Sequence, residues 1–218
     1  CPPYDWAQVL AFLAGRATAG VEQVELPSAR SAGRYRRAVA LAGAAGVVTV
    51  RPDGARSALL CEVSLSLAPV LLPLRRRLRA LFDLDAQPAA IAEHLRRDPV
   101  LAPLVERRPG LRVPGAFDGF ELAVRAILGQ QVSVAAATTL SGRLCARFGA
   151  PLPEAGAGAL RFPSPATLAA AGAAALAALG LPLGRAEAIV ALARAAAAGL
   201  DLSPGADPQE TIAALTGL

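Results

Sequence analysis

The chain has 218 residues, a length that allows one or two domains and a substantial hydrophobic core. Its composition, 54% hydrophobic and 18% charged, excludes an intrinsically disordered protein. The formal net charge is +5 and all 22 basic residues are Arg, which fits a polyanionic partner.

The first 82 residues alternate between helix and strand patterns. Asp5 can cap a first helix, whose apolar stripe begins at Trp6. Strand patterns follow at residues 21–26, 38–41, 47–51 and 59–65. Pro52-Asp-Gly54 is a turn signal between the last two, and a helix with an Arg-rich outer face is predicted over residues 69–81. The pattern therefore predicts an α+β domain over residues 1–82.

Every segment from residue 83 onward is predicted to be helical, which gives an all-α domain over residues 83–218 with at least five helices. A capping residue or a first-turn Pro marks four helix starts, at Pro88, Asp118, Ser164 and Asp207. Gly199 can end a helix over residues 185–198, and residues 103–114 are predicted to form a connection. The uncharged run over residues 162–184 is mostly Ala, Gly and Pro, so we predict a soluble helical pair and no membrane segment.

One turn in the second domain carries two neighbouring side-chain amides, Gln130 and Gln131. Asp118 and Glu121 have capping-box spacing, so we interpret both as caps of the helix before this turn. Gly129 can end that helix because glycine tolerates the left-handed conformation. A second apolar-striped helix follows the turn. On spacing alone, this feature is a polar loop in a helical bundle.

The segment Arg125-Ala-Ile-Leu-Gly-Gln-Gln-Val-Ser133, preceded by Arg107-Arg-Pro-Gly-Leu-Arg-Val-Pro-Gly115, resembles the DNA-facing corner of AlkA-type 3-methyladenine DNA glycosylases of the helix-hairpin-helix superfamily. Further matching segments occur in the same order: Pro2-Pro-Tyr-Asp-Trp6, Gly46-Val-Val-Thr49, Leu81-Phe-Asp-Leu84 and Phe162-Pro-Ser-Pro165. The resemblance implies an antiparallel sheet with packed helices in the first domain and a helix-hairpin-helix glycosylase domain in the second.

The resemblance also implies an activity. A glycosylase of this type flips an alkylated purine out of double-stranded DNA and hydrolyses its N-glycosidic bond, without a cofactor. Gln131 aligns with the residue that fills the gap in the base stack, where a well-known member of the family has Leu. Gln130, Arg125 and Ser133 are expected to contact DNA. Phe12 matches a residue of the aromatic pocket that would attract a cationic base, although an ordinary core position is the alternative.

The family's catalytic Asp and its Pro-Gly-Ile-Gly-like hairpin have no match in this chain. We expect both beyond Leu218, with Leu215-Thr-Gly-Leu218 as the lead-in to the hairpin, so this segment alone is predicted to be inactive. The chain contains no Met, and we interpret it as part of a longer reading frame that can include an upstream alkyltransferase or regulatory domain. Bifunctional glycosylases cut the strand through a Lys Schiff base. The chain contains no Lys, which agrees with a monofunctional enzyme.

Two other functions stay open at this point. One is a non-catalytic DNA-binding or damage-sensing module, and the other is a helical interaction domain that does not bind nucleic acid. Within the enzyme interpretation, specificity for an oxidised purine or a mismatch is also open. The three cysteines form no CxxC pair, so we predict neither a disulfide framework nor a metal site. We expect a monomer in the bacterial cytoplasm, associated with the nucleoid through DNA.

Overall fold

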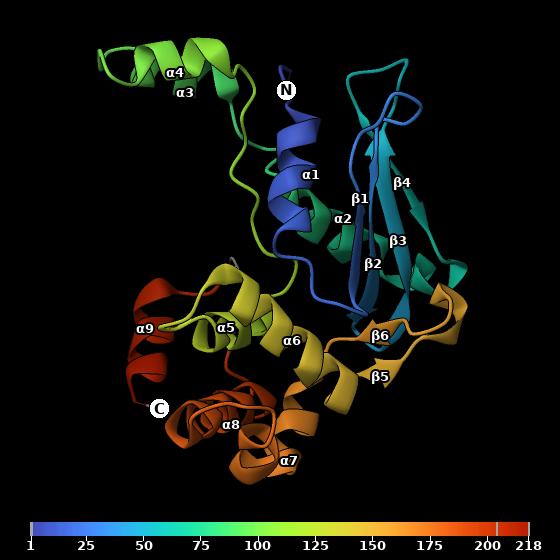
Figure 1. The fold of residues 1–218 in the computed structure, drawn as a ribbon, viewed down its shortest axis with the longest axis vertical. Helices are drawn as coiled ribbons and strands as arrows, with labels where there is room; N and C mark the ends of the chain where they lie inside the picture. Colours follow the sequence, from blue (N-terminus) through green and yellow to red (C-terminus); the bar gives the residue numbers. More distant parts are fainter. Residues whose placement is uncertain (1, 204, 218) are drawn as a thin grey trace.

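A four-stranded antiparallel sheet organises the first part of the chain (Figure 1). Its strands lie in the order β1 (Glu22–Glu25), β2 (Arg34–Leu41), β3 (Ala44–Pro52) and β4 (Leu59–Val63). The four predicted strands and the hairpin that begins at Pro52 are confirmed, although β2 begins at Arg34 and not at Ala38. This computed structural model describes residues 2–203 and 205–217.

Helices cover one face of this sheet. The helix α1 (Trp6–Ala14) begins at its predicted cap, where the Asp5 carboxylate accepts a 3.1 Å bond from the Gln8 amide. The short 3-10 helix η1 (Leu65–Val70) and the helix α2 (Leu71–Leu81) follow β4. The core on this face contains, among others, Trp6, Leu10, Tyr35, Val48, Leu74 and Phe82. Tyr35 and Phe82 pack edge to face with ring centroids 5.5 Å apart, a favourable aromatic geometry.

A segment of the second part covers the other face of the sheet. It consists of β5 (Ala150–Pro151), the 3-10 helix η2 (Pro153–Ala155) and β6 (Leu160–Arg161). Leu152 and Ala155 are buried against Ala38 and Val47, which are paired across β2 and β3. The prediction that every segment after residue 83 is helical was wrong here. Two-residue strands are too short to produce an alternating pattern in the sequence.

Five helices form the rest of the second part: α5 (Gly119–Leu128), α6 (Val134–Phe148), α7 (Pro165–Ala177), α8 (Leu183–Ala197) and α9 (Pro208–Thr216). The predicted caps are confirmed at α7, where Ser164 accepts from the Thr167 amide, and at α9, where Asp207 accepts from the Gln209 and Glu210 amides. Gly199 has φ +108° just after α8, as expected for a terminating glycine. Within the described residues, no helix is long and apolar enough to cross a membrane.

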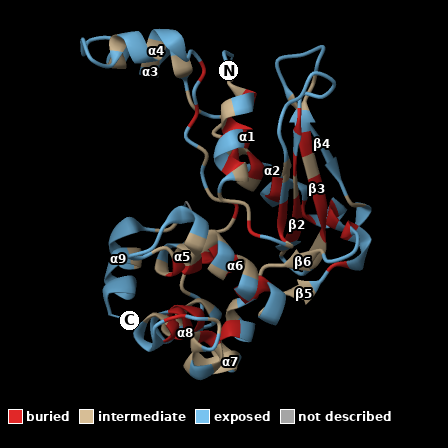
Figure 2. Ribbon diagram, viewed as in Figure 1, coloured by how far each residue is buried: buried red, intermediate tan, exposed pale blue. Residues whose placement is uncertain are grey.

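Two helices project away from both parts of the chain (Figures 1 and 2). They are α3 (Pro88–Leu95), which begins at the predicted Pro88, and α4 (Ala102–Arg107), and neither contains a buried residue. The connection predicted over residues 103–114 was therefore wrong in its first half. The segment that returns from α4 is attached where the Arg112 guanidinium donates to the carbonyls of Asp83, Ala86 and Pro3.

The chain passes from the core beneath the sheet to the core among the helices within a few residues. Phe117 is the last residue of the core beneath the sheet, and Phe120 is the first of the core among the helices. The domain boundary at residues 82 and 83 stays a prediction.

Candidate functional site

A cavity of about 460 Å³ lies at the junction between the sheet and the helices. The helix α1 contributes Phe12 to its wall, the turn after α1 contributes Arg16, and β2 contributes Arg37. The residues that line it from the second part include Leu122, Ala126, Gly129, Val132 and Val134. The volume falls within the range of pockets that bind small molecules.

Phe12 forms part of the cavity wall and is 39% exposed, so it does not occupy an ordinary core position. The apolar stripe of α1 buries Trp6, Leu10 and Leu13 against the sheet, which leaves Phe12 on the flank of the helix. The Arg16 guanidinium lies 3.9 Å from the centroid of the Phe12 ring. The ring therefore already holds a cation against its face, as expected of an aromatic surface that can receive a positively charged ligand.

The corner with the two amides lies beside this cavity. The helix α5 ends at Leu128, and both Gln130 and Gln131 are exposed. The prediction that Gly129 supplies the left-handed conformation was wrong, because Gly129 has φ −82° and Gln131 has φ +57°. A non-glycine residue in this region costs about 1–3 kcal/mol and is often found at functional sites.

Ser133, at the other end of the corner, is the N-cap of α6. Its hydroxyl oxygen accepts a 3.2 Å bond from the Ala136 amide, so it satisfies one of the free amides at the helix start. A DNA contact by Ser133 stays a prediction, as does one by Gln130.

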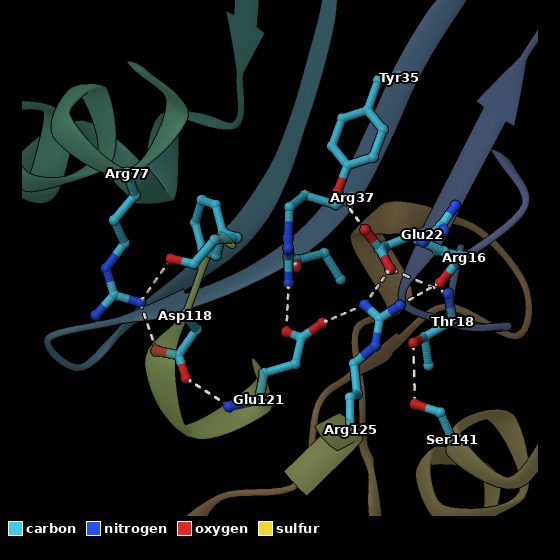
Figure 3. A network of polar contacts seen from close by, with 12 residues as sticks. Arg16, Thr18, Glu22, Tyr35, Arg37, Arg77, Asp118, Glu121, Arg125 and Ser141 are labelled. Atoms are coloured by element: carbon cyan, nitrogen blue, oxygen red, sulfur yellow. Dashed lines mark hydrogen bonds and ion pairs between the residues drawn. The ribbon is translucent and has the colours of Figure 1, made fainter. Parts of the chain in front are cut away.

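Arg125 has partners inside the molecule (Figure 3). Its Nη1 lies 3.4 Å from a carboxylate oxygen of Glu22 and 3.5 Å from one of Glu121, and its Nη2 donates to the Arg16 carbonyl. The side chain of Arg125 thus connects α5 to β1 and to the turn that follows α1. A DNA contact by Arg125 stays a prediction that these bonds do not support.

The two residues with capping-box spacing have different roles. Asp118 caps α5 as predicted, since it accepts a 3.0 Å bond from the Glu121 amide, and its carboxylate also pairs with Arg77 at 2.5 Å. The interpretation of Glu121 as a cap was wrong. Its side chain is 6% exposed and lies 2.8 Å from Nη2 of Arg37. Burial makes an ion pair the more favourable use of this carboxylate, because an unpaired buried charge is costly.

Arg37 and Glu22 are residues of this site that the sequence analysis did not identify. Along β2, Tyr35, Arg37 and Val39 alternate with their neighbours and are all buried, so the Arg lies on the apolar face of the sheet. That alternation was the available signal. Burial lowers the pKa of Arg37, but Glu121, Tyr35 and Glu22 together more than offset this effect, so the net pKa shift is upward and the guanidinium stays charged.

Glu22 completes the group. It lies directly opposite Arg37 in the strand register and accepts bonds from the Thr18 amide at 3.0 Å and from the Tyr35 hydroxyl. Burial raises the pKa of Tyr35 well above its ordinary value, which keeps the hydroxyl protonated as a donor. Each of the three carboxylates that line the cavity, those of Glu22, Asp118 and Glu121, is therefore engaged with an arginine.

Family models match nearly the whole chain. The AlkA N-terminal domain model matches residues 1–118, and the model of the HhH-GPD superfamily base excision DNA repair proteins matches residues 124–215. The chain is 42% identical over 201 residues to DNA-3-methyladenine glycosylase 2 of Escherichia coli (strain K12), covering 91% of this chain and 66% of that protein. A Mycobacterium tuberculosis protein described as a probable bifunctional transcriptional activator/DNA repair enzyme AlkA is 40% identical over 163 residues, covering 74% of this chain and 31% of that protein. The chain thus spans less than two thirds of the length of these relatives.

Solved structures of DNA glycosylases share the fold of this chain. A 3-methyladenine DNA-glycosylase from Archaeoglobus fulgidus has a TM-score of 0.74 at 26% identity, covering 88% of this chain and 63% of that chain. The 8-oxoguanine glycosylase/lyase of Clostridium acetobutylicum, in complex with double-stranded DNA, shares the fold with a TM-score of 0.62 at 18% identity, covering 89% of this chain and 63% of that chain. The chain therefore belongs to the AlkA-type family, within the HhH-GPD superfamily of base excision DNA repair proteins.

Proposed function

We propose that this protein is a monofunctional DNA repair glycosylase that excises alkylated purines of the 3-methyladenine type from double-stranded DNA. The observation that carries the proposal is the cavity at the junction, with an exposed aromatic ring in its wall and an exposed polar corner beside it. An enzyme that acts on a base must take it out of the stack, fill the gap and bind the base in a pocket. An alkylated purine carries positive charge, and the Phe12 ring suits a cation.

We assign the gap-filling role to Gln131. Its left-handed backbone and its exposure in the turn that follows α5 support this assignment. A Gln side chain has enough length to enter the gap, and its amide can hydrogen-bond the base that has lost its partner. Gln130 and Ser133 would then contact the flanking backbone, and we propose no cofactor.

The carboxylate that stabilises the oxocarbenium-like sugar is the catalytic Asp expected beyond Leu218. This assignment is supported by the pairing of Glu22, Asp118 and Glu121, which leaves none of the three lining carboxylates without an arginine. We propose base release by water, and within residues 1–218 there is no Lys that could form a Schiff base.

The same pairing favours a second candidate function, a non-catalytic DNA-binding or damage-sensing module. Such a module needs the corner and the pocket but no free carboxylate. Release of 3-methyladenine from alkylated duplex DNA separates the two functions, measured for the complete gene product and for this 218-residue chain. We expect release by the complete gene product only. DNA binding without release by either protein would establish the damage-sensing module and overturn the glycosylase.

The oligomeric state, the cellular location and the presence of further domains are also proposals. We infer a monomer that acts in the bacterial cytoplasm on nucleoid DNA. An upstream alkyltransferase or regulatory domain stays a prediction, which is supported by the description of the Mycobacterium tuberculosis relative as bifunctional.

Replacing Gln131 by Gly is expected to stabilise the fold by about 1 kcal/mol, because glycine adopts a positive φ without strain. The same change removes the side chain proposed to fill the gap, so base release should fall while the melting temperature rises. Thermal unfolding and an excision assay measure the two effects.

Ala42→Gly provides the matched control for Gln131→Gly. Ala42 has φ +47° in the turn between β2 and β3, away from the cavity lining. It should give a similar gain in stability with unchanged excision. Full activity in the Gln131→Gly variant would contradict the role of Gln131.

A further inference from the structure

We infer that the buried ion pair between Arg37 and Glu121 positions the two walls of the base pocket, an inference that rests on the proposed function. Arg37 comes from β2 and Glu121 from α5, so the pair connects the sheet to the helical part (Figure 3). The 2.8 Å contact joins side chains that are 4% and 6% exposed. Solvent therefore screens this interaction very little.

The pair extends into a charge-balanced group. Arg125 bridges Glu121 to Glu22, and the Glu22 carboxylate also accepts from the Thr18 amide. Two guanidinium groups and two carboxylates thus neutralise one another within the junction. A further buried bond of 3.0 Å joins the hydroxyls of Thr18 and Ser141, which ties the α1–β1 connection to α6.

Both arginines of this group contact a part of the pocket. Arg125 donates to the carbonyl of Arg16, two residues beyond the end of α1, the helix that carries Phe12. The carbonyl of Arg125 itself accepts a 2.9 Å bond from the Gly129 amide, at the start of the corner. The Arg37 guanidinium lies 4.0 Å from the ring centroid of Phe117, which lines the cavity. A change in the group would therefore move both walls relative to each other.

Stability alone does not require these charges. Well-packed apolar residues of similar volume often replace a buried ion pair with no loss of stability. What apolar contacts lack is direction, because hydrogen-bonded ion pairs fix both distance and angle. A flipped base must meet the ring and the catalytic groups in one geometry, and a misplacement of about 1 Å can reduce the rate about 100-fold. Orientation is thus the property that the pair adds.

The test compares three variants of the complete protein in single-turnover excision of 3-methyladenine, with 2-aminopurine next to the lesion as a reporter of base unstacking. Glu121→Gln keeps the shape and removes the charge, and we expect excision about 10- to 100-fold slower, with DNA affinity changed less than about threefold. The double variant Arg37→Met with Glu121→Leu removes both charges. The melting temperature of this double variant should be closer to that of the wild-type protein than the melting temperature of Glu121→Gln, while its excision stays slow.

Glu25→Gln is the matched control. Glu25 pairs with Arg34 at the exposed surface of β1 and β2, so this variant should behave as the wild-type protein.

Two results would overturn the inference. If excision by the double variant recovers together with its melting temperature, the pair contributes only stability. Wild-type excision in Glu121→Gln would show that the orientation does not depend on the pair. The proposed function fails separately: a wild-type protein that unstacks the lesion without releasing base is not a glycosylase, and the reporter then measures the effect of the pair on flipping. A wild-type protein that does neither overturns both proposals.

Discussion

Replacing Phe12 by Leu is expected to lower kcat/KM for release of 3-methyladenine by about 10- to 100-fold, because it removes the aromatic face and keeps most of the bulk. Phe12 is 39% exposed in the cavity wall, with Arg16 lying over its ring. When the alkylated base enters, it would replace Arg16 as the cation on this face. Single-turnover and steady-state kinetics on alkylated duplex DNA measure the loss.

The step that is slowed in Phe12→Leu depends on when the base carries its positive charge. The alkylated purine is cationic before the bond breaks and leaves as a neutral base, so the ring stabilises the flipped ground state more than the transition state. The variant should therefore flip less base, and a base that has been flipped should be cleaved at least as fast as in the wild-type protein. An uncharged lesion such as hypoxanthine, formed by deamination of adenine, is the internal control and should lose less. Phe12→Tyr should restore activity. Equal losses on charged and uncharged lesions would contradict the cation-binding role.

The parts of the fold that the sequence predicted depend on local chemistry. Asp5, Asp118, Ser164 and Asp207 cap the helices that follow them, since a short polar side chain can bond the free amides at a helix start. The strands were recognisable because β-branched and apolar residues alternate along them. Phe12 lines the cavity, and its role in a base pocket stays a prediction.

The parts that the sequence did not predict depend on contacts between distant segments. Glu121 of the helix α5 has the spacing of a cap, but Arg37 of the strand β2 lies close enough to form an ion pair with it. The strands β5 and β6 exist because the back of the sheet offers a surface at Ala38 and Val47. The left-handed residue of the corner is Gln131, although propensity favours Gly129. In each case tertiary structure overrides a local preference, and two of the three cases lie at the candidate site.

That pattern has a physical meaning. Sequence and structure tend to disagree where a protein departs from the locally most favourable arrangement for the sake of function. The buried charges at the junction and the strained backbone of Gln131 are departures of this kind. Both are adjacent to the cavity, whereas the caps Ser164 and Asp207, which do not line it, follow local rules.

Replacing Arg37 by Ala is expected to reduce the free energy of unfolding by about 3–5 kcal/mol, the largest stability loss that we predict for a single side chain of this site. The substitution leaves the 6% exposed Glu121 carboxylate with only Arg125, whose Nη1 is 3.5 Å away and is shared with Glu22. Urea unfolding followed by circular dichroism measures the loss. Arg34→Ala is the control, because the ion pair of Arg34 with Glu25 is 51% and 56% exposed and should contribute less than about 1 kcal/mol. Similar losses in the two variants would show that burial does not raise the cost of leaving a charge unpaired, and would remove the basis for assigning Arg37 an orienting role.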